Sequence, residues 1–214
     1  MLVREWMSAK PVTVHSNASI TEALRAMRQN QVRRLPVLDE NGTLVGIVSE
    51  KDLLYASPSP VTSLSIYEMH YLLSELKVSE LMTTEVITVT SDVPLEEAAR
   101  IMADTKIGGL PVVEEGQLVG IITETDIFKV FLELLGARDH GLRLTLEIPE
   151  RKGEIARITT ESARLGGNIL ALGTHASEDP TTAVVTVKLV DVPVETLKAA
   201  MRDLGLKILD LRQV

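Results

Sequence analysis

Two short stretches of the sequence combine the residue types that can hold a phosphorylated sugar. They are residues 46–52, GIVSEKD, and residues 120–126, GIITETD. In each, a glycine opens a β-branched strand, the strand ends at a hydroxyl residue, and an aspartate follows three positions later. A helix starting at the hydroxyl residue would offer N–H and O–H donors to a phosphate, and the aspartate could accept hydrogen bonds from a ribose diol. The candidate residues are Ser49, Asp52, Thr123 and Asp126.

The same spacing is also typical of a purely structural feature, the helix N-cap. A serine or threonine followed three positions later by an acidic residue forms a capping box, which satisfies backbone N–H groups at the helix start. A single copy would favour the cap. Two copies at the ends of two predicted strands favour a binding site and leave the cap open as an alternative.

The elements around these stretches are repeated with a nearly constant offset. Met7 and Met82 begin matching segments 82 − 7 = 75 positions apart, and the offset falls to 120 − 46 = 74 at Gly46 and Gly120, after a turn. Each copy predicts a strand, an amphipathic helix, a two-stranded hairpin and a second helix. The first helices have apolar residues at helical spacing (Ile20, Ala23, Leu24, Met27; Leu95, Ala98, Ala99, Met102), with Asn17 and Asp92 as candidate N-caps. The hairpins join residues 35–38 to 44–48 and residues 110–113 to 118–122.

This paired order resembles a tandem pair of cystathionine-β-synthase (CBS) domains over about residues 1–136. The resemblance implies two pseudo-symmetric α/β repeats, residues 1–56 and 78–136, that leave two clefts between them. It implies an adenosine ligand such as AMP, ADP or ATP, with S-adenosylmethionine or NADH as further candidates. It also implies that Ser49 and Thr123 hold phosphate and that Asp52 and Asp126 hold ribose.

The two repeats differ at the predicted cleft wall, where Arg33-Arg34 in the first copy corresponds to Gly108-Gly109 in the second. In CBS domains, basic residues at this position often contact phosphates. The alternative is that the two arginines are solvated and compensate the charges of Asp39 and Glu40. The glycines would allow a ring to approach the backbone closely. The predicted nucleotide-binding set therefore adds Arg33, Arg34 and Gly109, together with Val12 and Val86 from the paired segments that begin the repeats.

Residues 57–77 form a predicted linker between the repeats, with a Pro- and Ser-rich loop followed by a helix over residues 66–76. This insert is similar to that of acetoin-utilisation-type CBS proteins. Its Tyr67, His70 and Tyr71 could close over a cleft as a lid, although packing of a linker helix is the simpler interpretation.

A different pattern follows a second predicted linker at residues 137–141. Residues 142–214 predict strands and helices in the order βαββαβ, which is the ferredoxin-like α+β pattern. Residues 148–155, IPERKGEI, resemble the ligand loop of ACT domains, and residues 167–169, GNI, resemble that family's entry to its second strand. The resemblance implies side-by-side pairing and, as in many members, an amino acid held at Glu150, Gly153 and Asn168. Because Glu150 replaces the family's Asp and Lys152 its Pro, pairing without a ligand is the alternative.

Composition restricts the remaining functions. A net charge of −8 and 3% aromatic residues argue against nucleic acid as a partner, because such binding uses basic patches and stacking side chains. The chain has no cysteine, which removes thiolate metal sites and thiol catalysis. The sequence begins without an apolar signal core and has no membrane-spanning run, so we expect a cytoplasmic protein with no membrane contact. Its 4 histidines share no ligand spacing, and no nucleophile or phosphate-loop motif is present, so we do not expect an enzyme.

We therefore expect a regulatory homodimer that senses an adenosine nucleotide in the CBS clefts. Residues 137–141 would couple these clefts to an ACT domain that dimerises the chain or senses an amino acid. The sequence does not identify the target protein. The alternative is a homodimeric interaction scaffold that binds no metabolite.

Overall fold

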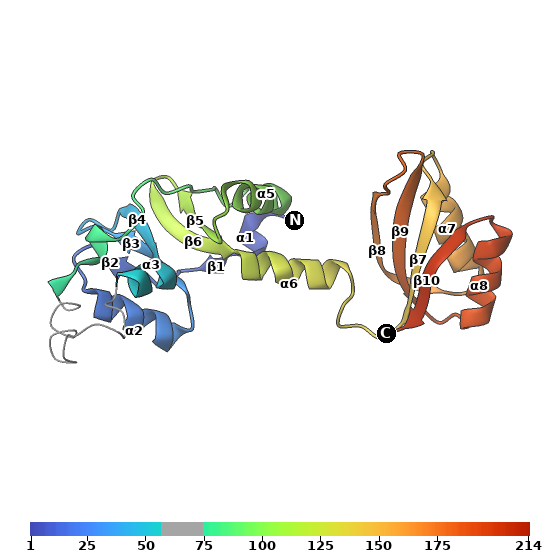
Figure 1. Ribbon diagram of the computed structural model, residues 1–214, viewed down its shortest axis with the longest axis horizontal. Coiled ribbons are helices and arrows are strands. Elements are labelled where there is room, and N and C mark those ends of the chain that lie inside the picture. Colours follow the sequence, from blue (N-terminus) through green and yellow to red (C-terminus); the bar gives the residue numbers. More distant parts are fainter. Residues whose placement is uncertain (57–74) are drawn as a thin grey trace. The chain divides into compact units, whose positions relative to one another are not determined.

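The computed structural model describes residues 1–56 and 75–214 (Figure 1). Contacts within the chain divide it into two units, Met1–Ile127 and Phe128–Val214. The boundary falls inside helix α6 (Glu124–Leu134), earlier in the chain than the linker predicted at residues 137–141. The predicted insert loop and most of its helix, with Tyr67, His70 and Tyr71, lie outside the described residues.

The first repeat has the predicted order of elements. It contains β2 (Val14–His15), α2 (Ile20–Asn30), β3 (Arg34–Leu38), β4 (Leu44–Ser49) and α3 (Glu50–Tyr55). β2 pairs in parallel with β3, and β3 pairs in antiparallel with β4. The apolar face of α2 is buried in a core that also contains Leu35 and Val37 of β3 and Val48 of β4. The apolar residues at helical spacing in α2 and the alternate residues of the strands thus pack into one core.

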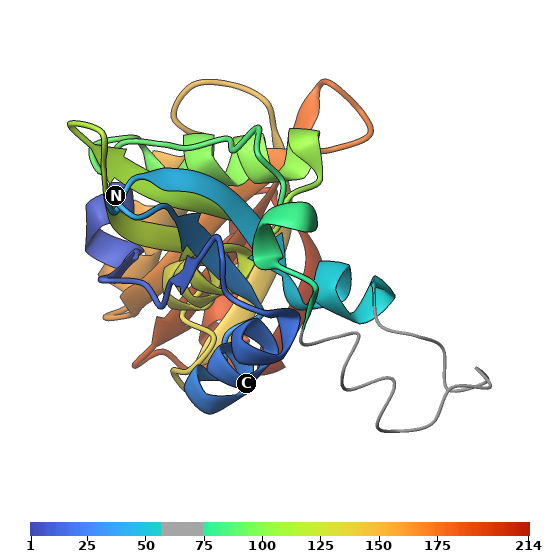
Figure 2. The ribbon, with the colours of Figure 1, turned by 90° about the vertical axis from the view of Figure 1, so that its left-hand side faces the viewer.

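The second repeat has the same order except at its predicted first strand, where Val89 forms only an isolated parallel bridge to Val112. It contains α5 (Leu95–Thr105), β5 (Gly109–Glu114), β6 (Gln117–Thr123) and the first part of α6. The two hairpins correspond by register, because Arg34 lies opposite Ser49 in the first and Gly109 lies opposite Thr123 in the second. In Figures 1 and 2 both hairpins lie between α2 and α5. The sequence repeat is therefore a structural repeat.

The segment that precedes each repeat in the sequence packs against the other repeat. At the start of the chain, α1 (Val3–Trp6) is followed by β1 (Ser8–Ala9), which pairs with β6 of the second repeat. The turn η1 (Val78–Glu80) binds the first repeat, where Val78 N donates to Ala18 O at 2.9 Å. Thr83 N then donates to Ile47 O of β4 at 2.9 Å. This exchange joins the repeats into one unit and brings the residues after Thr83 alongside the first hairpin.

The second unit contains β7 (Leu142–Pro149), α7 (Glu154–Arg164), β8 (Asn168–Ala176), β9 (Thr182–Val190), α8 (Val194–Asp203) and β10 (Lys207–Gln213). Its antiparallel sheet has the strand order β10-β7-β9-β8. Alternate residues of β7 and β9 are buried and form a core with Ile158, Leu197 and Met201 of the two helices. Helices α7 and α8 therefore cover one face of this sheet (Figure 1).

Candidate functional site

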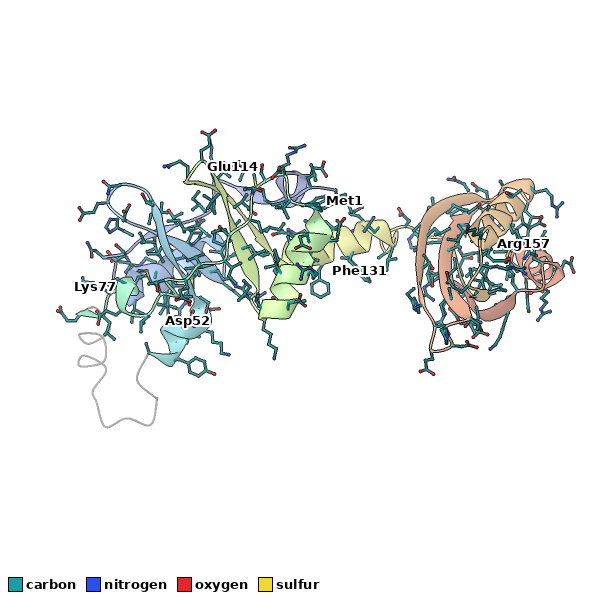
Figure 3. All side chains as sticks on the ribbon, turned by 90° about the horizontal axis from the view of Figure 1, so that it is seen from above. Met1, Asp52, Lys77, Glu114, Phe131 and Arg157 are labelled. Carbon is teal, nitrogen blue, oxygen red and sulfur yellow. The ribbon has the colours of Figure 1, made fainter. Side chains whose placement is uncertain are left out.

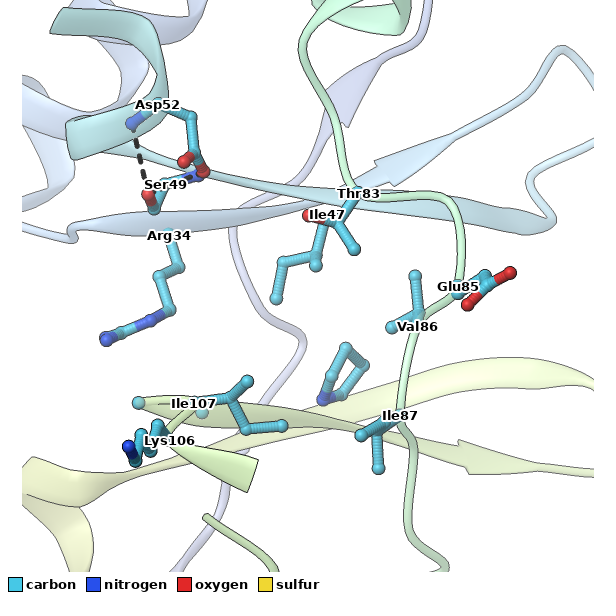
Figure 4. A pocket seen from close by; sticks show the side chains of 13 residues that line it. Arg34, Ile47, Ser49, Asp52, Thr83, Glu85, Val86, Ile87, Lys106 and Ile107 are labelled. Carbon is cyan, nitrogen blue, oxygen red and sulfur yellow. Dashed lines mark hydrogen bonds between the residues drawn. The ribbon is translucent and has the colours of Figure 1, made fainter. Parts of the chain in front are cut away.

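A cleft of about 290 Å³ opens in the first unit, between the two repeats (Figure 4). β3, β4 and the first turn of α3 form one wall, and the end of α5 with the start of β5 forms the opposite wall. The segment after Thr83 closes a third side. The lining residues are Arg34, Ile47, Ser49 and Asp52 of the first repeat, and Thr83, Glu85, Val86, Ile87, Lys106, Ile107, Gly108, Gly109 and Pro111 of the following segment and second repeat.

Ser49 and Asp52 form a capping box at the start of α3, as the structural alternative predicts. Ser49 Oγ accepts a hydrogen bond from Asp52 N at 3.3 Å, and Asp52 Oδ2 accepts from Ser49 N at 2.9 Å and from Ser49 Oγ at 2.6 Å. The other carboxylate oxygen, Asp52 Oδ1, has no hydrogen-bond partner among the described residues. The cap therefore fixes Asp52 at the cleft wall and leaves one strong acceptor available.

Arg34 extends from β3 toward the opposite wall (Figure 4). Its guanidinium group lies so close to Gly108 that a Cβ atom added there would collide with Arg34 Nη2 and Cζ. The ion pair of Arg34 is long, with Nη2 3.8 Å from Glu124 Oε2. Asp39, a partner considered from the sequence, instead accepts backbone hydrogen bonds from Asn41 at 2.9 Å and Thr43 at 2.8 Å. The positive charge of Arg34 is therefore only weakly compensated beside the cleft.

The predicted residues Val86 and Gly109 also line this cleft, whereas the others do not, namely Thr123, Asp126, Arg33 and Val12. They occupy positions that the repeat offset relates to its lining residues. Thr123 and Asp126 repeat two of the bonds seen at Ser49 and Asp52, since Asp126 Oδ2 accepts from Thr123 N at 3.1 Å and from Thr123 Oγ1 at 2.7 Å. The predicted nucleotide-binding residues thus divide between this cleft and the positions that are equivalent to it by the repeat offset. The corresponding pairs are Thr123 and Ser49, Asp126 and Asp52, Arg33 and Gly108, and Val12 and Ile87.

Several lining residues were not predicted from the sequence. The repeat offset could have identified Ile87, which is equivalent to Val12. No sequence signal marks Glu85 or Lys106. Lys106 follows α5 in the left-handed conformation, with φ of 57°, and this sharp helix ending directs the chain into the cleft wall. Lys106 gives the cleft a second cation besides Arg34.

In the second unit, Glu150 and Gly153 line a cavity of about 450 Å³ at the loop before α7. Gly153 has φ of 91°, which glycine adopts readily and other residues adopt only with strain. Asn168 does not join them within one chain. It lies opposite Val190 at the start of β8, whereas the cavity is at the other end of that strand, near Thr174 and Ala183. Within one chain, the structure thus brings Glu150 and Gly153 together and leaves Asn168 apart from them.

The neighbouring Glu154 is buried and bound by two arginines, one of them the Arg157 labelled in Figure 3. Its carboxylate accepts a hydrogen bond from Arg151 Nε at 2.6 Å and one from Arg157 Nη1 at 2.7 Å. The bond from Arg151, followed by that from Arg157, holds the pKa of Glu154 below its usual value. This charge cluster fixes the loop to the first turn of α7.

A family model of the CBS domain matches residues 3–59 and 78–133, which together make up more than half of the chain. The chain therefore belongs to the CBS domain family. The two matched ranges coincide with the two structural repeats and include both copies of the hydroxyl–aspartate stretch.

Relatives of known name align with the same part of the chain. A CBS domain-containing protein from Dictyostelium discoideum is 33% identical over 136 residues, which are 63% of this chain and 94% of that protein. L-aspartate semialdehyde sulfurtransferase from Methanocaldococcus jannaschii is 34% identical over 131 residues, which are 61% of this chain and 23% of the enzyme. The similarity to the enzyme thus covers a small share of its length.

Solved structures of CBS pairs are also similar. The CBS domain pair of protein MJ0100, in complex with 5′-methylthioadenosine and S-adenosyl-L-methionine, has 33% identity and a TM-score of 0.52, covering 65% of this chain and 98% of that one. An AcuB protein from Vibrio cholerae, assigned by its name to acetoin utilisation, has 34% identity and a TM-score of 0.53, covering 64% and 95%. CBSX2 in complex with AMP has 34% identity and a TM-score of 0.50, covering 61% and 96%.

Two features are absent from residues 1–56 and 75–214. No group of histidine, aspartate and glutamate side chains in these ranges could hold a metal ion. No helix in them combines the length and apolar character needed to cross a membrane.

Proposed function

We propose that this protein is a regulatory sensor that binds an adenosine nucleotide in the cleft between its CBS repeats. The observation that carries the proposal is that Ser49, Asp52 and Arg34 line one cleft. The names of two similar structures support it, since one holds AMP and the other holds S-adenosyl-L-methionine and 5′-methylthioadenosine.

Each wall of the cleft supplies a different part of the proposed recognition. Asp52 Oδ1 accepts hydrogen bonds from the ribose hydroxyls, and its negative charge strengthens them. Arg34 and Lys106 compensate the phosphate charge, with the guanidinium able to bind two phosphate oxygens at once. The apolar side chains of Ile47, Val86 and Ile107 offer a surface for the adenine ring.

The cleft volume favours a small ligand. Ligand pockets commonly measure roughly 300–1,000 Å³, and this cleft of about 290 Å³ lies near the lower limit. A mononucleotide is therefore a better candidate than a dinucleotide such as NADH. We extend the proposal to a second, pseudo-equivalent site at Thr123 and Asp126, with Arg33 and Val12 at its corresponding positions.

For residues 142–214 we propose an ACT domain that dimerises the chain or senses an amino acid at Glu150 and Gly153. The βαββαβ order and the sheet order β10-β7-β9-β8 support a ferredoxin-like fold of this kind. Nucleotide binding would act on an unidentified target protein by favouring one of two conformations, as ligand-driven regulation requires. The similarity to an AcuB protein favours acetoin utilisation as the regulated process.

A thermal-shift panel tests this function. AMP, ADP, ATP, S-adenosylmethionine and the common amino acids are each added to the full chain. A ligand present at 100 times its dissociation constant should add about 2.7 kcal/mol to the free energy of unfolding. Stabilisation by at least one adenosine ligand is expected, and its absence across the panel would favour the scaffold alternative. Light scattering addresses the dimer, because a mass of 23.4 kDa at micromolar concentration would contradict it.

A further inference from the structure

The sheet of the second unit has a cavity on the face that α7 and α8 do not cover. The cavity measures about 590 Å³, within the roughly 300–1,000 Å³ range typical of small-molecule sites. Residues from β8 and β9 form its floor, and Phe131 of α6 and Leu135 lie in its wall. Phe131, labelled in Figure 3, is 54% exposed. A cavity on this face is distinct from both the nucleotide cleft and the loop at Gly153.

A buried cation lies in this mostly apolar cavity. Lys188 alternates with the core residues of β9, so that its side chain lies on the uncovered face of the sheet. It is only 6% exposed, and its ammonium group donates one hydrogen bond, to Gly136 O at 2.8 Å. No carboxylate among the described residues forms an ion pair with it. Because an ammonium group has three N–H donors, two remain for a ligand.

Arg143, a second cation in the cavity wall, contacts the carboxylate of Asp210, which also pairs with Arg212. Arg143 Nη1 donates to Asp210 Oδ2 at 3.2 Å. Thr186, also in the wall, shares a hydrogen bond with Thr145 at 3.2 Å. Burying a lysine without a counter-charge costs free energy, and this cost falls when an anion pairs with it. Lys188 differs from Arg143 because it is buried and has no carboxylate partner among the described residues.

We propose that this cavity binds a small monocarboxylate with an apolar body. The carboxylate pairs with the Lys188 ammonium group, and the hydrocarbon part lies against Phe131, Leu135 and Ala171. A neutral apolar ligand would leave Lys188 without a counter-charge. A ligand with several charges would place the additional ones against apolar walls.

Calorimetric titration of the full chain with octanoate tests the proposal, with 1-octanol as the neutral probe of equal length. Octanoate is expected to bind saturably and at least about tenfold more tightly than octanol, because a hydrogen-bonded charge pair is lost with the alcohol. Lys188→Met keeps the length of the side chain and removes its charge, so octanoate should bind about tenfold or more weakly. Lys207→Met, which changes a surface lysine of β10, is the matched control and should bind as wild type does.

A second variant keeps Lys188 and fills the cavity. Gly173 of β8 lines the cavity and lies opposite Thr186 of β9. A Cβ atom added to Gly173 would have ordinary space, since its nearest neighbour would be Leu135 Cδ2 at 3.5 Å. Gly173→Val should reduce octanoate binding while the protein stays folded. The proposal is overturned if wild type gives no saturable octanoate binding, if octanol binds as tightly as octanoate, or if either cavity variant binds like wild type.

Discussion

Arg34 and Gly108 belong to different repeats, and the guanidinium group of Arg34 occupies the space that a side chain on Gly108 would need. The offset of 75 makes Gly108 the equivalent of Arg33, so the repeats differ where they face each other (108 − 33 = 75). The first repeat supplies the guanidinium group of Arg34, and Gly108 of the second repeat leaves the space that this group occupies. This asymmetry gives the cleft an arginine that reaches across from one wall to the other.

The first prediction concerns Arg34→Met, which retains a long side chain and removes the charge. Binding of ATP should weaken by roughly tenfold, because a charge-assisted contact to phosphate is lost. Binding of adenosine should change little. Titration calorimetry with both ligands measures the difference. Arg25→Ala, an exposed arginine of α2, is the control, and equal losses for ATP and adenosine would argue against a phosphate contact.

A second prediction concerns the contact between Met82 and Gly46. A Cβ atom on Gly46 would collide with Met82 Sδ and would lie 2.8 Å from its Cγ, and Gly120 has the equivalent relation to Met7 Sδ at 2.6 Å. Gly46→Val should lower the free energy of unfolding by about 1–3 kcal/mol through overpacking. Denaturant unfolding measures this loss, and Gly173→Val is the matched control because a Cβ atom there would make only an ordinary contact, with Leu135 Cδ2 at 3.5 Å.

The double variant Gly46→Val with Met82→Ala separates crowding from strand effects. Removing the methionine side chain makes room for valine, so the double variant should be more stable than the two single losses added together predict. Additive losses would show that Met82 is not the source of the strain.

The third prediction concerns pH and Glu154. Arg151 and Arg157 hold the pKa of this carboxyl below its usual value of about 4.3, so its ionised form is favoured in the folded state. The stabilisation is therefore fully present above the usual pKa and is lost as pH falls through the lower, folded-state pKa. Glu154→Gln should destabilise the protein at pH 7 by roughly 1 kcal/mol or more, since charged hydrogen bonds are lost.

Unfolding experiments at pH 7 and near pH 3 test this prediction. The difference between Glu154→Gln and wild type should shrink as pH is lowered, because protonation of the wild-type carboxyl removes the charge that its hydrogen bonds depend on. Glu195→Gln is the control, because Glu195 is exposed and its contact with Lys198 is long, at 3.7 Å. A difference that does not depend on pH would mean that packing, not charge, accounts for the role of Glu154.

Local patterns predicted most elements of the repeats. The hairpins were predicted at residues 35–38 with 44–48, and the strands are Arg34–Leu38 and Leu44–Ser49. Alternation and the Asn-Gly turn suffice for this, because both act over a few residues. The candidate N-cap Asn17 was wrong, since Ser19 caps α2 and exchanges hydrogen bonds with Glu22. Likewise Pro94, and not Asp92, precedes α5.

Long-range features could not be predicted in the same way. The two residues of β1 are too few to show a period, and their pairing with β6 depends on tertiary contact. The same holds for the site. The spacing of Ser49 and Asp52 marks their role, but the reach of Arg34 across to Gly108 and the position of Lys106 depend on how two repeats pack. Asn168 was grouped with Gly153 by resemblance, whereas the register separates them along β8.

The most direct test of the central claim is a calorimetric titration of AMP into wild type, Asp52→Asn and Asp126→Asn. Asparagine retains the shape of the side chain and one acceptor oxygen but removes the charge that favours the ribose hydroxyls. We predict that Asp52→Asn binds AMP about tenfold or more weakly, while its capping loss lowers stability by only about 1 kcal/mol. Asp104→Asn, an exposed aspartate of α5, should bind as wild type does. If Asp52→Asn and Asp126→Asn both bind AMP as tightly as wild type and only unfold more easily, the two aspartates are helix caps and the cleft is not the nucleotide site.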